Sequence, residues 1–387
     1  MKVCSDTLED YSVRIFDTLS TIDEKTWDTI NGLLPFYQTH RFLSVIEKIH
    51  PDMECRYILI SREDKIVAAL YVQLLDFSFR NLVNYSGDIS KGLTGRFKKF
   101  IARKNTKLLN LGNVFFTGDK GIISRDDSFV VSRIPEIFKV VQKSFTRQRP
   151  FAALIANIYL QDEKKCINFR TKAFYPFNTE PDMFMTVDPD WKTFDDYINS
   201  FSSKYRVRAK KVLSVSHEIQ QKELSLEDIM AQQEPIGKLY NNVVNHVAFN
   251  MATLNISFFK EMKMLYGDNC MLFGYYLNGE MVSFACLFPV DPGALHVHYI
   301  GLNYEVNKTY KLYNRMLLDF VRFAIGRKVQ IIHFGRTATE IKTTIGAEPR
   351  PLHAYLKLNN RLANSTLPYF LNRIKPAEYI ARNPFKE

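Results

Sequence analysis

Each half of the chain contains a helical pattern of apolar residues followed by two β-rich runs. A Glu63-Asp64 turn separates the two runs of the first half, and Asn278-Gly279 separates those of the second. Asn-Gly between two β-rich runs is a strong hairpin signal. Each half therefore predicts a helix and then a β-hairpin. The segments are 41–47, 56–60 and 66–72 in the first half, and 258–262, 271–275 and 281–287 in the second.

The similarity continues downstream, where each half predicts a strand, an amphipathic helix and a buried strand. Such a crossover predicts one parallel pair in an otherwise antiparallel sheet. The simplest interpretation is two α/β (α+β) domains of one type, 1–188 and 189–387, each a mixed, mostly antiparallel sheet flanked by helices. Unrelated halves are the alternative. The predicted segments are 107–116, 129–145 and 151–159, then 294–301, 307–325 and 329–334, with further helices over 194–215, 226–247 and 368–381.

Composition narrows the class of protein. The 387 residues are 46% apolar and 24% charged, which argues against a disordered, collagenous or coiled-coil chain and against one small module. No stretch approaches the ~20 apolar residues that span a bilayer, and residues 1–13 contain no apolar run that could serve as a signal peptide. The five cysteines are scattered and include no CxxC pair. These features predict a cytoplasmic protein.

The net charge of +11 is concentrated in two segments. Residues 91–107 hold seven bases and no acid, and residues 202–211 hold five bases and no acid, so the remainder is nearly neutral. Phe97, Phe100 and Ile101 fall at helical spacing in the first segment, which predicts a basic amphipathic helix suited to peripheral contact with the inner face of a membrane. Solvated helix faces are the simpler interpretation. The functional one is an anionic ligand, such as phosphates, an acidic carrier protein or lipid headgroups.

Several catalytic motifs are missing from the sequence. The 16 glycines include no GxGxxG and no Gly-Lys-Ser/Thr, which removes the usual dinucleotide fingerprint and the P-loop. No His or Cys cluster has zinc spacing, and no Ser stands in GxSxG. The remaining expectation is chemistry by positioning and proton transfer, without a metal or a tightly bound cofactor.

A series of short motifs follows the chain in order. They are Trp27, Pro35-Phe36, Phe42-Leu43, Glu47, Ser203-Lys204-Tyr205-Arg206-Val207-Arg208-Ala209-Lys210-Lys211, Tyr299-Ile300-Gly301, Gly335-Arg336-Thr337, Glu340-Ile341-Lys342 and Gly346-Ala347. This series resembles the tandem-GNAT acyltransferases related to the FemAB peptidyltransferases. The similarity covers most of the chain and is strongest from Phe201 to Tyr355.

The resemblance implies two GNAT-like domains, a cleft mainly in the second, and transfer of an acyl or aminoacyl group to a small amine-bearing acceptor. The loop 302–307 departs from simple GNAT enzymes, because it lacks the Arg/Gln-x-x-Gly-x-Gly/Ala turn that cradles the coenzyme A pyrophosphate in that family. FemAB relatives lack this turn too. The implied donor, a co-substrate, is therefore acyl-CoA bound in another way, an acyl carrier protein or an aminoacyl-tRNA.

Amide formation requires a base for the ammonium, donors for the carbonyl oxygen and a proton for the leaving group. His296 and His298 lie two apart on the predicted strand 294–301 and share a face, with Tyr299 on the other. His298 is the favoured base, because its strand is expected to line the cleft. Two partly buried structural histidines are the alternative.

Arg336, Glu340 and Lys342 follow the strand that ends at Phe334. The Gly335-Arg336-Thr337 run would place backbone N–H groups and a cation at the carboxyl edge of the sheet, where α/β proteins bind ligands. Lys342 would polarise the acyl oxygen or bind an anionic group. The alternative is a surface ion pair between Arg336 and Glu340, one helical turn apart.

The candidate site joins these residues to an aromatic side chain and the second basic segment. Tyr313 could stack on an acceptor, although aromatic residues at helical spacing are more often core. The catalytic candidates are His298, Tyr299, Glu340 and Lys342, and the substrate- or donor-binding candidates are Lys204, Arg206, Arg208, Tyr313, Gly335 and Arg336.

A second hypothesis is a non-catalytic binding module that docks RNA or an anionic membrane through the two basic segments. It predicts binding that weakens steeply with salt. The sequence contains no recognised nucleic-acid motif and no stacking platform of aromatic and basic residues, which favours the N-acyltransferase hypothesis.

Overall fold

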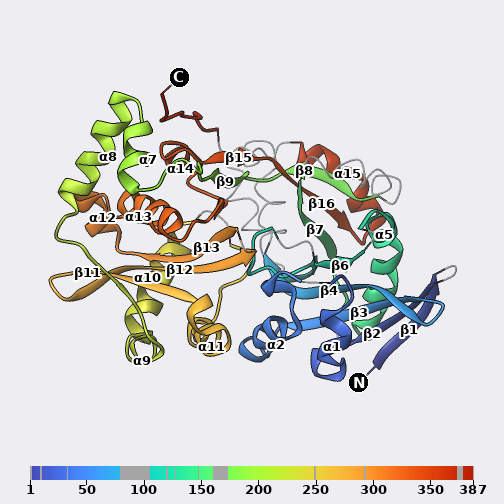
Figure 1. The fold of residues 1–387 in the computed structure, drawn as a ribbon. Helices are drawn as coiled ribbons and strands as arrows, with labels where there is room; N and C mark the ends of the chain where they lie inside the picture. Colours follow the sequence, from blue (N-terminus) through green and yellow to red (C-terminus); the bar gives the residue numbers. More distant parts are fainter. Residues whose placement is uncertain are drawn as a thin grey trace. The chain divides into compact units, whose positions relative to one another are not determined.

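The computed structural model describes residues 2–8, 11–32, 34–78, 105–118, 121–125, 127–146, 148–159, 173–247, 250–291, 293–372 and 378–386. The chain divides into two compact units. Unit 1 comprises Met1–Thr179, Ala248–Leu254 and Pro351–Pro376, and unit 2 comprises Glu180–Val247, Asn255–Arg350 and Ala377–Glu387. Each unit is built around one mixed sheet with helices on both faces (Figure 1).

The strands of unit 1 are β1 (Lys2–Leu8), β2 (Tyr11–Phe16), β3 (Glu54–Arg62), β4 (Lys65–Ser78), β5 (Asn105–Leu111), β6 (Ile122–Ser124), β7 (Ala152–Tyr159), β8 (Tyr175–Asn178) and β16 (Leu352–Leu358). Its helices are η1 (Leu19–Thr21), α1 (Glu24–Asp28), η2 (Phe36–Gln38), α2 (His40–Ile49), α5 (Asp127–Ser144) and α15 (Arg361–Leu371). The strand order is β1-β2-β3-β4-β5-β7-β16-β8, with β6 paired to β4. In this order β5 and β7 run parallel, and their neighbours pair antiparallel.

Alternation along the strands of unit 1 gives its sheet two apolar faces. Ile58 packs with Ile134 of α5 in one buried cluster. The preceding residue, Tyr57, faces the other way and meets the ring of Trp27 from α1 at 5.8 Å. The Glu63-Asp64 turn between β3 and β4 has φ values of 46° and 61°, the left-handed conformations that a two-residue hairpin turn requires. The predicted hairpin is therefore confirmed.

The strands of unit 2 are β9 (Asp182–Thr186), β10 (Gln220–Glu223), β11 (Met271–Leu277), β12 (Glu280–Asp291), β13 (Ala294–Leu302), β14 (Ile331–Gly335) and β15 (Glu348–Arg350). Its helices are α7 (Phe194–Ser200), α8 (Ser203–Val215), α9 (Leu226–Ala231), α10 (Gln233–His246), α11 (Ser257–Tyr266), η5 (Gly267–Asn269), α12 (Tyr304–Tyr310), α13 (Leu312–Gly326) and α14 (Thr339–Thr343). The strand order is β10-β11-β12-β13-β14-β9-β15, in which β13 and β14 run parallel.

Two layers of helices cover the sheet of unit 2. Helices α7, α8 and α13 lie on one side, and α9, α10 and α11 lie on the other (Figure 1). Val297 and Phe334 point to the first side, where they share a buried cluster with Met316 of α13 and Ala209 of α8. Phe258 of α11 is fully buried and contacts the ring of Tyr299, on β13, from the second side.

The two units repeat one arrangement, as the sequence pattern predicted. In each, a helix precedes a hairpin, and a strand–helix–strand crossover then adds the parallel pair. The crossovers are β5–α5–β7 in unit 1 and β13–α12–α13–β14 in unit 2. The mixed, mostly antiparallel sheets and their tandem order are confirmed.

The chain crosses from one sheet to the other twice. Strand β8 belongs to the sheet of unit 1 and the next strand, β9, to that of unit 2, whereas β15 belongs to unit 2 and β16 to unit 1. The observed units consequently differ from the expected division at residue 188. Residues 180–188 belong to unit 2 and residues 351–376 to unit 1. The reason is the backbone pairing of β9 with β14 and of β16 with β7, which local sequence patterns do not record.

Several predicted helices have different bounds in the structure. The helix expected over 307–325 is interrupted at Lys311, whose φ of 52° separates α12 from α13. The segment 194–215 forms α7 and α8, and the segment 226–247 forms α9 and α10. The closing helix predicted over 368–381 is wrong in position, because α15 spans Arg361–Leu371 and residues 378–386 are not helical.

The predicted basic helix at 91–107 falls mainly outside the described residues; its last three residues begin β5. Of the helices in the described ranges, none combines the length and apolar character needed to cross a membrane.

Candidate functional site

The parallel strands of unit 2 part before they end. Their pairing covers three residues in each strand and stops where His296 lies opposite His333. Strand β13 nevertheless continues to Leu302 and β14 to Gly335. The carboxyl ends of these strands thus diverge, and the carboxyl edge of the sheet is where open α/β folds bind ligands. This edge is the candidate site.

A β-bulge lies on β13 at this edge. Tyr299 pairs with Cys286 of β12 while Val297 pairs with the next residue, Leu287, so His298 is an extra residue in β13. A bulge breaks the alternation of side chains and re-aims the residues beside it. Bulges of this kind are common next to active sites.

The bulge places His298 and Tyr299 on the same side of the sheet. Their rings lie 4.3 Å apart, and both meet the ring of Phe258 from α11, at 5.8 Å and 6.0 Å. The expectation that Tyr299 points away from His298 is therefore wrong, because it assumed regular alternation. Tyr299 also meets the ring of Tyr240 from α10 at 5.7 Å, so these rings form one aromatic cluster.

The two histidines of β13 are held neutral by their surroundings. Burial, assisted by the neighbouring His333, lowers the pKa of His298 to about 3. Burial and then His333, His298 and Lys342 lower the pKa of His296 well below its ordinary value. A base is most effective when its pKa lies near the working pH. His298 is therefore poorly matched to the role of base at neutral pH that the sequence suggested.

Lys342 is buried and caps the end of β14. Its Nζ donates to the backbone carbonyls of Phe334, Gly335 and Arg336 at 2.8, 3.0 and 2.8 Å. Burial lowers the pKa of Lys342 to about 7, although the carboxylates of Asp182 and Glu180 act in the opposite direction. An ammonium group has three protons, and three carbonyls accept them here. The geometry therefore fits a residue that positions the 334–336 segment rather than one that polarises an acyl oxygen.

Gly335 ends β14, Arg336 follows it, and Glu340 lies in the first turn of α14. Gly335 has a φ of 69°, which is left-handed backbone that glycine adopts without strain. Arg336 is half-buried just beyond the strand. Glu340 is exposed and accepts from Arg382 Nη2 at 2.8 Å. The ion pair in this turn thus involves Arg382, not the Arg336–Glu340 pair considered from sequence.

The basic candidates lie on the other side of the sheet. Lys204 and Arg208 are exposed on α8 and flank the ring of Tyr205, at 5.8 and 5.5 Å. Arg206 is half-buried, and its Nη1 donates weakly to the carbonyl of Asn199 at 3.5 Å. Because α8 packs on the face opposite His298, the structure does not gather the predicted site residues into one cluster.

Tyr313 also belongs to the side of α8. It is half-buried in the first turn of α13, packs against the buried core, and its backbone N–H donates to Asn307 Oδ1 at 2.8 Å. Burial raises its pKa above the ordinary value. These contacts fit the structural alternative for this aromatic residue.

Two residues of the candidate edge were not predicted from sequence. Asp182 of β9 is fully buried, and its Oδ2 lies 2.6 Å from Nε2 of His333 on β14. The two residues are far apart in the chain and belong to no motif, so only the antiparallel pairing of β9 with β14 joins them. Within the described part of the chain, no three His, Cys, Asp or Glu side chains are arranged to hold a metal ion.

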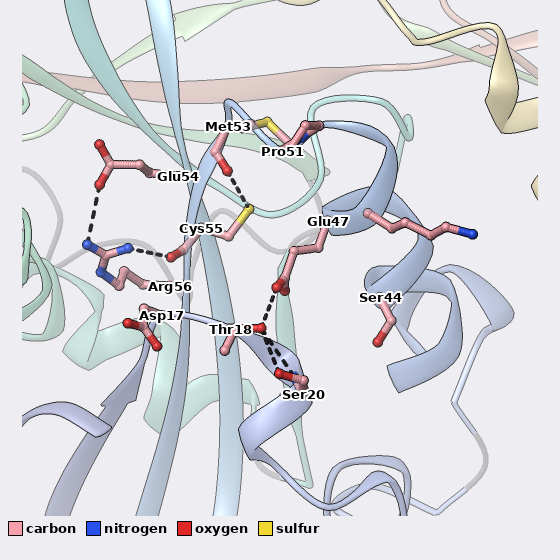
Figure 2. A pocket seen from close by; sticks show the side chains of 11 residues that line it. Asp17, Thr18, Ser20, Ser44, Glu47, Pro51, Met53, Glu54, Cys55 and Arg56 are labelled. Atoms are coloured by element: carbon pink, nitrogen blue, oxygen red, sulfur yellow. Dashed lines mark hydrogen bonds and ion pairs between the residues drawn. The ribbon is translucent and has the colours of Figure 1, made fainter. Parts of the chain in front are cut away.

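Unit 1 contains a polar pocket of about 530 Å³ between η1, the end of α2 and the start of β3 (Figure 2). Glu47 accepts hydrogen bonds from Thr18 Oγ1 and from the backbone N–H of Leu19, the latter at 3.1 Å. Arg56 donates to the Cys55 carbonyl at 2.7 Å. Burial raises the pKa of the Cys55 thiol to about 12, which leaves it protonated and unreactive. The bonds shown in Figure 2 join the lining residues to one another, which fits a structural role.

Comparisons with known proteins define the fold. No family model matches the sequence, and no curated protein matches it. Among solved structures, FemX is similar, with a TM-score of 0.52 and 12% identity over 90% of this chain and 98% of that one. A tandem GNAT protein from the clavulanic acid biosynthesis pathway is also similar, with a TM-score of 0.51 and 9% identity over 89% of this chain and 98% of that one. The chain therefore has the fold of two GNAT-like domains in tandem.

Proposed function

We propose that this protein is an N-acyltransferase, which moves an acyl or aminoacyl group from a thioester or ester donor to an amine. The observation that carries the proposal is the parting of β13 and β14 beyond His296 and His333, in a fold shared with FemX and a tandem GNAT protein. Where the strands diverge, their facing backbone groups no longer pair with each other. The amide and carbonyl groups of a donor could form hydrogen bonds with these backbone groups instead.

The residues at this edge support transfer by positioning and proton movement. The bulge at His298 and the turn at Gly335 place polar groups on both strands, and Lys342 fixes the backbone of that turn. Arg336 supplies a cation beside the turn for an anionic part of the donor or for the developing oxyanion. Direct attack of the amine on the donor carbonyl also requires a base that removes a proton from the ammonium.

The donor is proposed to be acyl-CoA, with an acyl carrier protein or aminoacyl-tRNA as the other candidates. The tandem GNAT structure is described as the form without AcCoA, so acetyl-CoA is the first donor to test. Each candidate donor carries phosphates, and the exposed bases of α8 offer a surface for them. The same surface would serve the alternative, a non-catalytic module that binds RNA or an anionic membrane.

The test is a donor and acceptor panel. The full chain is incubated with acetyl-CoA, longer acyl-CoAs, acyl carrier protein thioesters or aminoacyl-tRNA, together with amino sugars, amino acids and peptides. We expect release of one donor that depends on the acceptor, and a product whose mass equals acceptor plus acyl group. Binding that is salt-sensitive but without turnover of any donor would instead favour the non-catalytic module.

A further inference from the structure

The contact between Asp182 and His333 places a carboxylate beside an imidazole at the candidate edge. The two side chains come from neighbouring antiparallel strands, β9 and β14, and Nε2 of His333 lies 2.6 Å from Oδ2 of Asp182. The side chain of Asp182 is fully buried, and that of His333 is 11% exposed. A carboxylate at this distance can fix one nitrogen of an imidazole ring, as in catalytic His–carboxylate pairs.

The ring of His333 is fixed in one orientation. It stacks on Phe184 with the ring centres 4.3 Å apart and the planes within 3° of parallel. His296 meets it edge-on, at 4.0 Å and 84°. These three residues form a row across the sheet, because His296 pairs with His333 and His333 pairs with Phe184. The guanidinium of Arg350 covers Phe184 at 3.9 Å, so the stack is closed at that end.

His333 also lies at the point where the strands part. It is the last residue of β14 that pairs with β13, and the diverging segments begin immediately after it. A donor bound between the strand ends would therefore have its reacting carbonyl near this ring. The polar groups beyond it are those of His298 on β13, of Gly335 at the end of β14 and of Arg336 just after that strand.

The other titratable groups nearby are less suited to the role of base. His296 and His298 are kept neutral by burial, which makes them weak proton acceptors at pH 7. Lys342 donates its protons to three backbone carbonyls. The carboxylates of Asp182, the first residue of β9, and of Glu180, two residues before it, raise the pKa of Lys342 and so oppose the effect of its burial. The carboxylate of Asp182, in turn, contacts Nε2 of His333.

We propose that His333 is the catalytic base of this protein and that Asp182 is its positioning residue, an inference that rests on the proposed N-acyl transfer. His333 takes a proton from the acceptor ammonium. The neutral nitrogen attacks the donor carbonyl carbon, so that a C–N bond forms and the C–S or C–O bond to the leaving group breaks. The nitrogen loses two protons in all: one passes through His333 to the leaving thiolate or alkoxide, and the other goes to water.

The proposal is tested by chemical rescue. Once the wild-type protein turns over a donor–acceptor pair, His333→Ala and His333→Gln are compared with it, and His217→Gln, at an exposed histidine after α8, is the matched control. General-base removal lowers rates by about 10²–10⁴-fold, so we expect kcat to fall by at least ~10²-fold in both variants with KM changed only a few-fold. Added imidazole should restore turnover in His333→Ala, and more basic imidazoles should restore it better. The control should retain wild-type kcat.

Asp182→Asn tests the role of the carboxylate independently, because it keeps the size of the side chain and removes its charge. We expect kcat to fall and added imidazole to give no rescue, since the ring is still present. Circular dichroism and thermal unfolding identify the variants that fold. If His333→Ala does not fold, the kcat of His333→Gln is used. Wild-type kcat in a folded His333 variant would overturn the base assignment while the proposed function stands. Absence of turnover by the wild type across the panel would overturn both.

Discussion

The rings of His298 and Tyr299 lie 4.3 Å apart on one side of the second sheet, although the two residues are adjacent in a β-strand. Regular alternation would send them to opposite faces. The extra residue at position 298 removes that constraint and turns both rings toward Phe258 of α11. The rings of His298 and Tyr299 thereby join an aromatic cluster, while Ile300 and Leu302 of the same strand pack with the core residues of α13.

The burial of His298 predicts a pH-dependent stability. Its pKa is about 3 in the folded protein and near 6.5 when unfolded, so the unfolded chain binds more protons between these values. Stability therefore falls as pH decreases from 6.5 toward 3, by at most about 1.4 kcal/mol per pH unit for one group. Urea unfolding at pH 7 and pH 5 measures this loss. The loss should be smaller in His298→Phe, and an equal loss in both proteins would contradict the assignment.

The lowered pKa of Lys342 predicts a change in stability on the alkaline side of neutral pH. Its pKa of about 7 in the folded protein is below the value near 10.5 of an unfolded lysine, so the unfolded chain again binds more protons between them. Stability should rise as pH increases from 7 to 9, and the rise should shrink in Lys342→Met. The comparison is urea unfolding at both pH values, with the exposed Lys210→Met as control.

The same Lys342→Met variant should be less stable than wild type at pH 7. Methionine fills the space but leaves the carbonyls of Phe334, Gly335 and Arg336 without their donor. Each unsatisfied buried group costs about 1–3 kcal/mol, which outweighs the relief of removing one desolvated charge. We expect a loss of a few kcal/mol together with reduced turnover. A variant that keeps full stability but loses turnover would instead indicate direct contact between Lys342 and the donor.

The exposed bases of α8 predict a salt-sensitive donor affinity. Replacing Lys204 and Arg208 by Gln should raise the KM for the donor several-fold at low salt and leave kcat nearly unchanged, because these side chains lie on the face opposite His298. Steady-state kinetics at 50 and 300 mM salt test this. The matched control replaces Arg327 and Lys328, which are exposed after α13. Equal effects of both sets would show that only net charge matters.

Glu47 predicts a purely structural effect in unit 1. It accepts from Thr18 and from the backbone of Leu19, and so joins α2 to η1 beside the polar pocket. Glu47→Ala should destabilise the protein by about 1–3 kcal/mol, because a partly buried N–H and hydroxyl lose their acceptor. Thermal unfolding and donor and acceptor KM values are measured together. A changed KM at unchanged stability would assign a ligand to this pocket.

The elements of this protein follow largely from local pattern. Apolar periodicity gave the hairpins at Glu63-Asp64 and Asn278-Gly279 and the crossover helices, because side chains alternate in strands and recur every three to four residues in helices. The helix break at Lys311 was not predicted, since lysine in the left-handed region carries no local signal. The ordered motifs predicted the tandem fold that the structure and its similarity to FemX show.

The arrangement of residues at the candidate edge depends on contacts that no local sequence pattern predicts. His298 and Lys342 were identified by their place after predicted strands, but their environments were not, because burial, a bulge and three backbone acceptors arise only when strands and helices pack. Asp182 and His333 were missed because strand pairing, and not proximity in sequence, brings them together.

The sequence by itself determined the helix, hairpin and crossover of each half, their repeat in both halves and the charge of α8, all of which depend on residues close together in the chain. Only the tertiary structure decided the exchange of β9 and β16 between the sheets, the parting of β13 from β14 and the pairing of Asp182 with His333. Backbone hydrogen bonds between strands carry no residue-specific code, so their partners are chosen by the packing of the whole unit.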